Sequence, residues 1–438
     1  MNRISRLEGE IGIEVYSTKT EGIGGSIRQM AEDFFVNEIT NRVEGDKGEY
    51  LIVELTKRDW DTNHLIRELS RILHVSQRRF GWAGTKDKHA VTRQKLSIWD
   101  VSEEDLNRIN LQGVELKKIG YANRSIAMGD LYGNEFTIVI RDLDLPIEDV
   151  RDAVGSTCQE IKENGIANFF GSQRFGSSRP VTHLVGEEIL HCDFEKAVMT
   201  YIAKPFPDES REAREAREYI WETGDLKGGL KKMPLFLRFE RALLDYLIAN
   251  PGDYAGSFSV LPKNLKSMFV HAYQSLIFNK ILSSRIKRGI PIDEAIIGDV
   301  VCFKNEMGFP NVRKTQKVNS KNLDGINNLI KRGRAFTTIP IIGYETELME
   351  GIQGDIERDV LDELGIEPDD FRIEPMPEFG SKGLRREIML PVDIEYSVEE
   401  DETSQDRRKV ELTFMLPKGS YATIVLREFM KNEMDLTP

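Results

Sequence analysis

The run "GWAGTKDKHAVTRQ", residues 81–94, places one carboxylate, Asp87, between Lys86 and Lys88. Neighbouring positive charges favour the ionised form of a carboxyl group, so we expect Asp87 to carry its negative charge at neutral pH. An ionised carboxylate suits a nucleophile or a general base and does not suit a general acid. The alternative is a lysine-rich β-turn in which Asp87 bonds only to its own backbone, and the local sequence leaves both interpretations open.

The charge around this run differs from that of the whole chain. The 438 residues carry a formal net charge of −13, which by itself disfavours a nucleic-acid partner. Residues 57–95, however, hold ten Lys and Arg against four Asp and Glu, whereas residues 355–370 hold eight acids and one Arg. The basic region around Asp87 therefore fits an anionic substrate, with a solvated charged surface as the alternative.

Three further runs contain residue types that could assist such chemistry. "RQMAEDFFVNE" (residues 28–38) brings Arg28, whose guanidinium could pair with a carboxylate. "NFFGSQRFG" (168–176) offers Asn168 to bond a base or ribose edge and an adjacent phenylalanine to stack on a base. "LPKGSYAT" (416–423) could bring Lys418 near a phosphate. Taken singly, a surface arginine, a core phenylalanine pair and a strand-to-helix turn explain the same residues.

The hydrophobic pattern places the Asp87 run in a loop between two strands. It predicts strands at 50–55, 92–99 and 135–140, a helix that Asp61 or Thr62 can cap and that continues to Leu73, and a second helix over 150–161. Residues from about 180 to 375 favour helices, and strand character returns at 410–416 before a final helix. A strand pattern that resumes after a long helical stretch predicts a discontinuous domain with a helical insertion.

Several classes of site have no support in the sequence. Cys158, Cys192 and Cys302 lie far apart without zinc-site spacing, and the six histidines form no ligand pattern, so we expect no metal. No dinucleotide-binding glycine motif is present. Residues 1–16 lack the apolar core of a signal peptide and no segment approaches 18 apolar residues, so we expect a cytoplasmic protein without a membrane span.

Taken together and in this order, "EDFFVNE" (32–38), "FGWAGTKDKHAVTRQ" (80–94), "NFFGSQRFG" (168–176) and "LPKGSYATIVLRE" (416–428) resemble the TruD family of pseudouridine synthases. "HAYQSLIFN" (271–279) extends the resemblance, more loosely, into the middle of the chain. The resemblance implies an α+β fold: a catalytic domain with a mixed, largely antiparallel β-sheet flanked by helices, interrupted by a mainly helical α/β insertion domain specific to this family. We expect the catalytic domain at 1–170 and 381–438 and the insertion at 171–380.

The same resemblance implies isomerisation of uridine to pseudouridine in tRNA, at position 13 of the D arm, without a cofactor or metal. It assigns the catalytic carboxylate to Asp87 and its basic partner to Arg28. It assigns base binding to Asn168 and Phe170, and we expect Lys86 to contact the RNA. A non-catalytic RNA-binding protein and a carboxylate-dependent nucleoside glycosidase are the alternatives. The oligomeric state is not defined by the sequence, which is compatible with a monomer.

Overall fold

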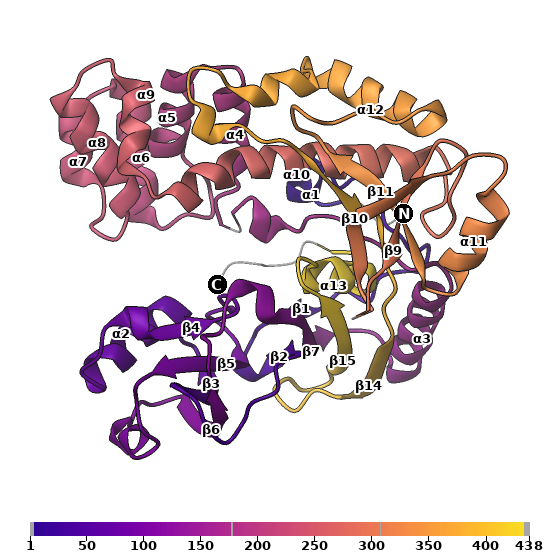
Figure 1. Cartoon of the computed structure of the whole chain (residues 1–438), viewed down its shortest axis with the longest axis horizontal. Coiled ribbons are helices and arrows are strands. Elements are labelled where there is room, and N and C mark those ends of the chain that lie inside the picture. Colours follow the sequence, from indigo (N-terminus) through magenta and orange to yellow (C-terminus); the bar gives the residue numbers. More distant parts are fainter. Residues whose placement is uncertain (1–3, 177, 307, 433–438) are drawn as a thin grey trace.

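The computed structural model describes residues 4–176, 178–306 and 308–432. Figure 1 shows a helix-rich part that contains most of the middle of the chain and a sheet-rich part that combines strands from the first third of the chain with strands from its last part. The colours of Figure 1 show that the last strands and helix of the chain lie beside strands from its first third. The fold therefore joins the two ends of the sequence around a central insertion.

The largest sheet has nine strands in the order β14-β15-β7-β2-β5-β3-β6, with β1 beside β7 and β4 beside β5. Among the described strands of this sheet, β2 and β5 form the one parallel pair, and the other pairs are antiparallel. The strands are β1 (Ser26–Ile27), β2 (Phe34–Thr40), β3 (Tyr50–Arg58), β4 (Phe80–Trp82), β5 (Val91–Trp99), β6 (Val114–Ala122), β7 (Leu131–Leu143), β14 (Ile394–Glu400) and β15 (Arg408–Pro417).

Alternation along the strands gives this sheet one buried face. Phe34, Val36 and Glu38 of β2 are buried at every second position, and Phe34 meets Phe136 of β7, whose ring stacks on Phe414 of β15. Side chains two residues apart in a strand lie on the same face, so these residues share one side of the sheet. Three helices pack near the sheet: α2 (Thr62–Ile72), α3 (Ile147–Asn164) and α13 (Ala422–Met430).

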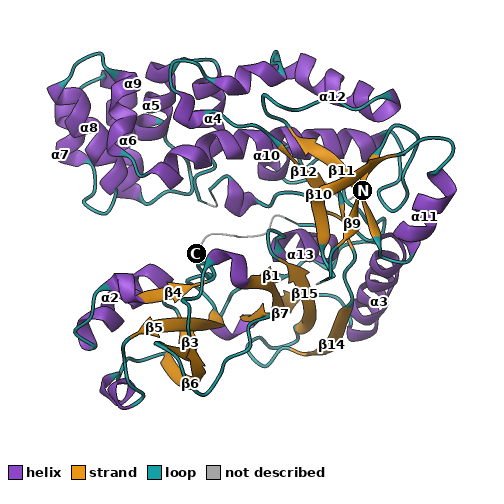
Figure 2. Cartoon of the chain, viewed as in Figure 1, coloured by secondary structure: helices purple, strands orange, loops and turns teal. Residues whose placement is uncertain are grey.

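The insertion is built around the long helix α10 (Lys263–Lys287), which packs against α4 (Thr182–Leu190) and α12 (Gly351–Leu364). Most residues from Phe269 to Leu282 are buried, as expected of a helix enclosed by others. The remaining helices are α1 (Arg6–Glu10), α5 (Phe194–Ala203), α6 (Arg211–Thr223), α7 (Leu226–Lys232), α8 (Arg238–Ala249), α9 (Tyr254–Ser257) and α11 (Leu323–Lys331). Figure 2 shows how helices dominate this part of the molecule.

Two smaller sheets complete the fold. One has the order β10-β9-β11-β12, and the other pairs β13 with β8. Their strands are β8 (Ile166–Ala167), β9 (Val300–Lys304), β10 (Pro310–Lys317), β11 (Ala335–Ile341), β12 (Leu384–Glu387) and β13 (Met389–Leu390). The pairing of β8 with β13 fixes the segment that leads into Asn168.

The α+β class and the mixed, largely antiparallel sheet are confirmed. The expected strands correspond to β3, β5, β7 and β15, and the two expected helices to α2 and α3. Asp61 caps α2 by accepting a hydrogen bond from the His64 amide at 2.8 Å. The domain boundaries near 170 and 380 stay predictions.

Candidate active site

The loop that carries Asp87 joins β4 to β5 and folds back over the sheet. The Lys86 amide donates to Thr62 Oγ1 of α2 at 3.3 Å, and Gln94 Nε2 of β5 donates to the Gly84 carbonyl at 3.4 Å. Gln94 is buried in the middle of β5. The loop therefore lies against α2 and against the central parallel strands.

Asp87 keeps its carboxylate accessible while a guanidinium contacts it. Its side chain is 44% exposed, and Arg28 Nη2 lies 3.6 Å from Asp87 Oδ1. Arg28 is itself 12% exposed, stacks over the Phe34 ring at 4.3 Å, and has a left-handed backbone with φ of 62°. Such a conformation is unfavourable for a non-glycine residue and persists where the surrounding structure enforces it. The backbone of Arg28 and its contact with Phe34 thus hold the guanidinium within ion-pair distance of Asp87.

A second cation holds the backbone of Asp87. Lys57 of β3 is fully buried, and its Nζ donates to the Asp87 carbonyl at 2.7 Å. Burial lowers the pKa of Lys57 to about 8, although the nearby Asp87 carboxylate opposes this change. Lys57 is one of the ten bases of residues 57–95 that favoured an anionic substrate, and for this residue a direct contact with the substrate is excluded because its side chain is fully buried.

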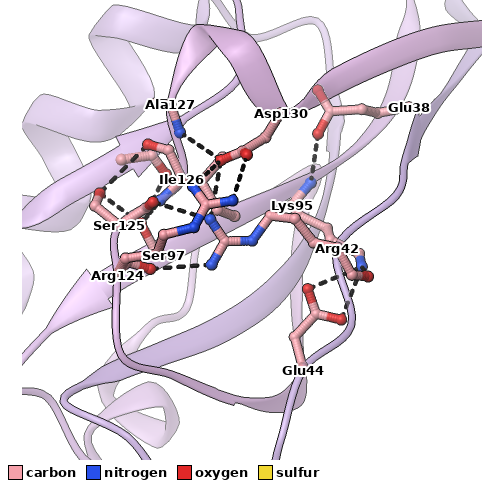
Figure 3. Close-up of polar contacts among 11 residues, drawn as sticks. Glu38, Arg42, Glu44, Lys95, Ser97, Arg124, Ser125, Ile126, Ala127 and Asp130 are labelled. Atoms are coloured by element: carbon pink, nitrogen blue, oxygen red, sulfur yellow. Dashed lines mark hydrogen bonds and ion pairs between the residues drawn. The ribbon is translucent and has the colours of Figure 1, made fainter. Parts of the chain in front are cut away.

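Lys86 points to a buried carboxylate. Its Nζ lies 2.8 Å from Glu38 Oε2 of β2, and the two side chains are 5% and 0% exposed. Glu38 Oε1 also accepts a hydrogen bond from the Lys95 amide of β5 at 3.3 Å (Figure 3). Lys86 thus fastens the loop to the central strands, and its expected contact with RNA stays a prediction.

The contacts of Glu38 continue into a polar network beyond the loop. Lys95 Nζ is 2.9 Å from Glu44 Oε2, and it also donates to the Arg42 carbonyl (Figure 3). Arg42 and Arg124 both donate to Asp130. Burial opposes the ionised form of Asp130, but hydrogen bonds from Arg124, the Ala127 amide and Arg42 outweigh it and hold its pKa at about 2. Charged groups thus brace the ends of β2 and β7.

Asn168 and Phe170 lie in a separate cluster between the sheet-rich and helix-rich parts. The Asn168 side chain donates to the Glu387 carbonyl at 3.1 Å and accepts from Arg386 Nη2 at 2.5 Å. The Phe170 ring contacts Phe278 of α10 and has the Arg386 guanidinium 4.2 Å from its centroid.

The backbone of Phe170 is also fixed, because Asn279 of α10 accepts from its amide at 2.9 Å and donates to its carbonyl at 3.0 Å. These contacts come from β12 and α10, and Tyr421, in the segment before α13, also meets the Phe170 ring edge to face with the centroids 6.2 Å apart. The structure brings together Arg28, Lys86 and Asp87, and it holds Asn168 and Phe170 through other contacts.

Sequence reasoning missed Glu38, Lys57 and Arg386 as parts of these clusters. Glu38 lay within the quoted run 32–38, and Lys57 follows the predicted strand 50–55, so both were visible as charged residues beside apolar strands. A buried charge needs a partner, and that requirement was the available signal. Arg386 had no comparable local signal.

Within residues 4–176, 178–306 and 308–432, no group of three or more His, Cys, Asp or Glu is arranged to hold a metal ion. Over the same residues, no helix is long and apolar enough to cross a membrane.

A largely antiparallel mixed sheet with an arginine-paired carboxylate on a central loop fits the class of pseudouridine synthases that the sequence motifs indicated. The comparisons with known proteins agree. The family model for tRNA pseudouridine synthase D (TruD) matches residues 10–429. A probable tRNA pseudouridine synthase D of Methanococcoides burtonii is 54% identical over 434 residues, which cover 99% of each chain.

More distant relatives and a solved structure give the same result. A probable tRNA pseudouridine synthase D of Archaeoglobus fulgidus is 40% identical over 433 residues, covering 98% of this chain and 100% of the relative. A crystal structure assigned to TruD from Methanosarcina mazei superposes with a TM-score of 0.87 at 53% identity and covers 98% of both chains. The chain belongs to the tRNA pseudouridine synthase D (TruD) family.

Proposed function

We propose that this chain isomerises uridine to pseudouridine in tRNA, at position 13 of the D arm, with Asp87 as the catalytic carboxylate. The observation that carries the proposal is the setting of Asp87 in a chain of this family. Its carboxylate is 44% exposed, while Arg28 contacts its side chain and Lys57 its backbone. A reactive carboxylate needs this combination of access and fixed position.

The reaction detaches the uracil ring from C1′ of the ribose and reattaches it to the same carbon through C5. The N1–C1′ bond breaks, the uracil turns, a C5–C1′ bond forms, C5 loses its proton and N1 gains one. Atoms and electrons balance without a co-reactant, so the proposal includes no cofactor. Asp87 begins the sequence by attack on C1′ or C6 or by removal of the C2′ proton, and the three routes share the same position for the carboxylate.

The other predicted residues have positioning roles in this proposal. Arg28 orients the Asp87 carboxylate, and Lys86 holds the loop through Glu38. Asn168 bonds the polar edge of the uracil and Phe170 stacks on its ring. Asn168 is 0% exposed with its Oδ1 bonded to Arg386, and Phe170 is 7% exposed with Arg386 against its ring, so both contacts with the uracil require Arg386 to withdraw.

The target uridine must leave the folded tRNA to reach Asp87, and unstacking a base costs a few kcal/mol. The contacts of basic side chains with phosphates offset that cost, so binding should weaken as salt rises.

The test is incubation of the full chain with an unmodified tRNA transcript, followed by carbodiimide mapping of pseudouridine. A single new pseudouridine at position 13 is the expected result. Binding without any pseudouridine would identify a non-catalytic RNA-binding protein, and release of free uracil would identify a glycosidase. Pseudouridine at another position would refute the proposed target and retain the reaction.

A further inference from the structure

The connection between α7 and α8 exposes apolar and basic side chains together. Leu235, Phe236 and Phe239 are 80%, 64% and 41% exposed. Lys231, Lys232 and Arg238 of the same run are exposed as well. We call residues 231–239 the α7–α8 surface. Figure 1 shows that α7 and α8 lie at the end of the helix-rich part, away from the nine-stranded sheet.

Internal contacts fix the backbone of this surface. Met233 is buried, and Arg241 Nη1 donates to the carbonyls of Leu230 at 2.8 Å and Met233 at 2.6 Å. The Leu237 amide closes a turn by donating to the Pro234 carbonyl at 3.1 Å. The exposed rings therefore stand on a fixed turn, which reduces the entropy lost when a partner binds.

The charge of the run is positive on a chain whose net charge is −13. Residues 226–239 contain four bases and no Asp or Glu. The acids on either side already have partners. Asp225 accepts hydrogen bonds from Tyr219 Oη and the Gly228 amide, and the buried Glu240 accepts from Arg217 Nη2. The surface is therefore complementary to a polyanion.

We propose that the α7–α8 surface binds unpaired nucleotides of the tRNA substrate, by stacking of Phe236 and Phe239 on bases and by contacts of Lys231, Lys232 and Arg238 with phosphates. Every base has a ring face, so such stacking is largely independent of sequence. In a duplex those faces are already stacked, and binding through them requires loops or single strands. This inference rests on the proposed function, because it takes tRNA as the partner.

Substitutions at Phe236 separate ring stacking from simple apolar burial. The full chain is compared with Phe236→Leu, which keeps an apolar side chain, and with Phe236→Trp, which keeps an aromatic face. Ile352→Ala is the control, since Ile352 lies on α12 and is 54% exposed. The probes are an unmodified tRNA transcript and a blunt RNA duplex of equal length.

Loss of one stacked base weakens binding by about 5- to 150-fold. We expect that loss for Phe236→Leu with the tRNA transcript, near-normal affinity for Phe236→Trp and for Ile352→Ala, and no effect of Phe236→Leu on the duplex. In assays of pseudouridine formation the loss should fall on KM rather than on kcat. Lys231→Glu with Lys232→Glu should lower the slope of log affinity against log salt by about 0.7 to 0.9 for each phosphate contact removed.

Equal tRNA affinity for Phe236→Leu and the unchanged chain would overturn the inference, as would equal losses on tRNA and duplex. A change in sedimentation of the protein alone on Phe236→Leu, without a change in tRNA affinity, would instead assign the surface to contact between copies of this chain. Failure of the proposed function can be told apart from failure of this inference. In that case the unchanged chain forms no pseudouridine, and the tRNA affinities of the variants can still be compared.

Discussion

Replacing Glu38 by glutamine should both destabilise the sheet-rich part and displace Asp87. The substitution removes one charge of a pair whose side chains are 0% and 5% exposed and whose atoms lie 2.8 Å apart. Loss of one partner from a buried pair costs about 3–5 kcal/mol, because the remaining charge stays out of water. We expect a value near the lower end, about 3 kcal/mol, because the loop can open and let Lys86 reach solvent.

Opening of the loop carries Asp87 away from Arg28, so kcat should fall even under conditions in which the variant remains folded. A displacement of about 1 Å can lower the rate of an enzyme by about 100-fold. Glu38→Gln should therefore lose about two orders of magnitude in kcat at a temperature where the protein is still folded. Glu38→Leu combined with Lys86→Met should recover part of the stability, since an apolar pair replaces a buried ion pair with little net cost while the Lys95 amide loses its Glu38 acceptor.

Urea unfolding followed by tryptophan fluorescence measures the stability, since Trp60, Trp82 and Trp99 belong to the sheet-rich part. Lys88→Met is the matched control, because Lys88 is the exposed lysine on the other side of Asp87. We expect this control to change the free energy of unfolding by less than about 0.5 kcal/mol. If Glu38→Gln changed the free energy of unfolding as little as Lys88→Met does, the buried pair would not be what holds the loop.

Three further outcomes follow from the same contacts. Burial lowers the pKa of Lys57 to about 8 in the folded chain, so between about pH 8 and 10.5 the unfolded chain binds more protons than the folded chain. The free energy of unfolding of the unchanged chain should therefore rise with pH over this range relative to that of Lys57→Met, as measured by urea unfolding. Asp130 has a pKa of about 2, so its contribution is complete above about pH 4 and is lost as the pH falls toward 2; Asp130→Asn should flatten that part of an acid titration followed by circular dichroism. Phe170→Leu, which keeps an apolar side chain in the core, should lower kcat more than tRNA affinity in filter-binding and pseudouridine assays, and an unchanged kcat would leave the ring a packing residue only.

Local pattern was enough to predict the elements around the candidate site. The strands that became β3 and β5 and the capped helix α2 follow from periodicity and from Asp61, which are properties of neighbouring residues. The return of strand character at 410–416 also predicted that the end of the chain joins the first sheet, and β15 pairs with β7.

Contacts between residues that are far apart in the sequence could not be predicted from local pattern. From its neighbours in sequence, Lys86 is indistinguishable from a surface lysine. In the structure, the parallel pairing of β2 with β5 places Glu38 beneath the loop, where it contacts Lys86. Lys57 stands beside Arg58 at the end of a strand, and only the fold shows that one is buried and the other exposed. Arg386 lies 218 residues from Asn168 in sequence, and it reaches Asn168 because β13, which follows β12 directly, pairs with β8 just before Asn168.

The most direct test of the assignment of Asp87 as the catalytic carboxylate compares the unchanged chain with the Asp87→Asn variant. The assay measures the release of tritium from tRNA labelled at C5 of uridine. The substitution keeps the size of the side chain and removes its charge, and the backbone contact with Lys57 does not depend on that side chain. We predict that Asp87→Asn binds the tRNA transcript and releases no tritium above background. Near-normal tritium release by Asp87→Asn would contradict the assignment of Asp87 as the catalytic carboxylate.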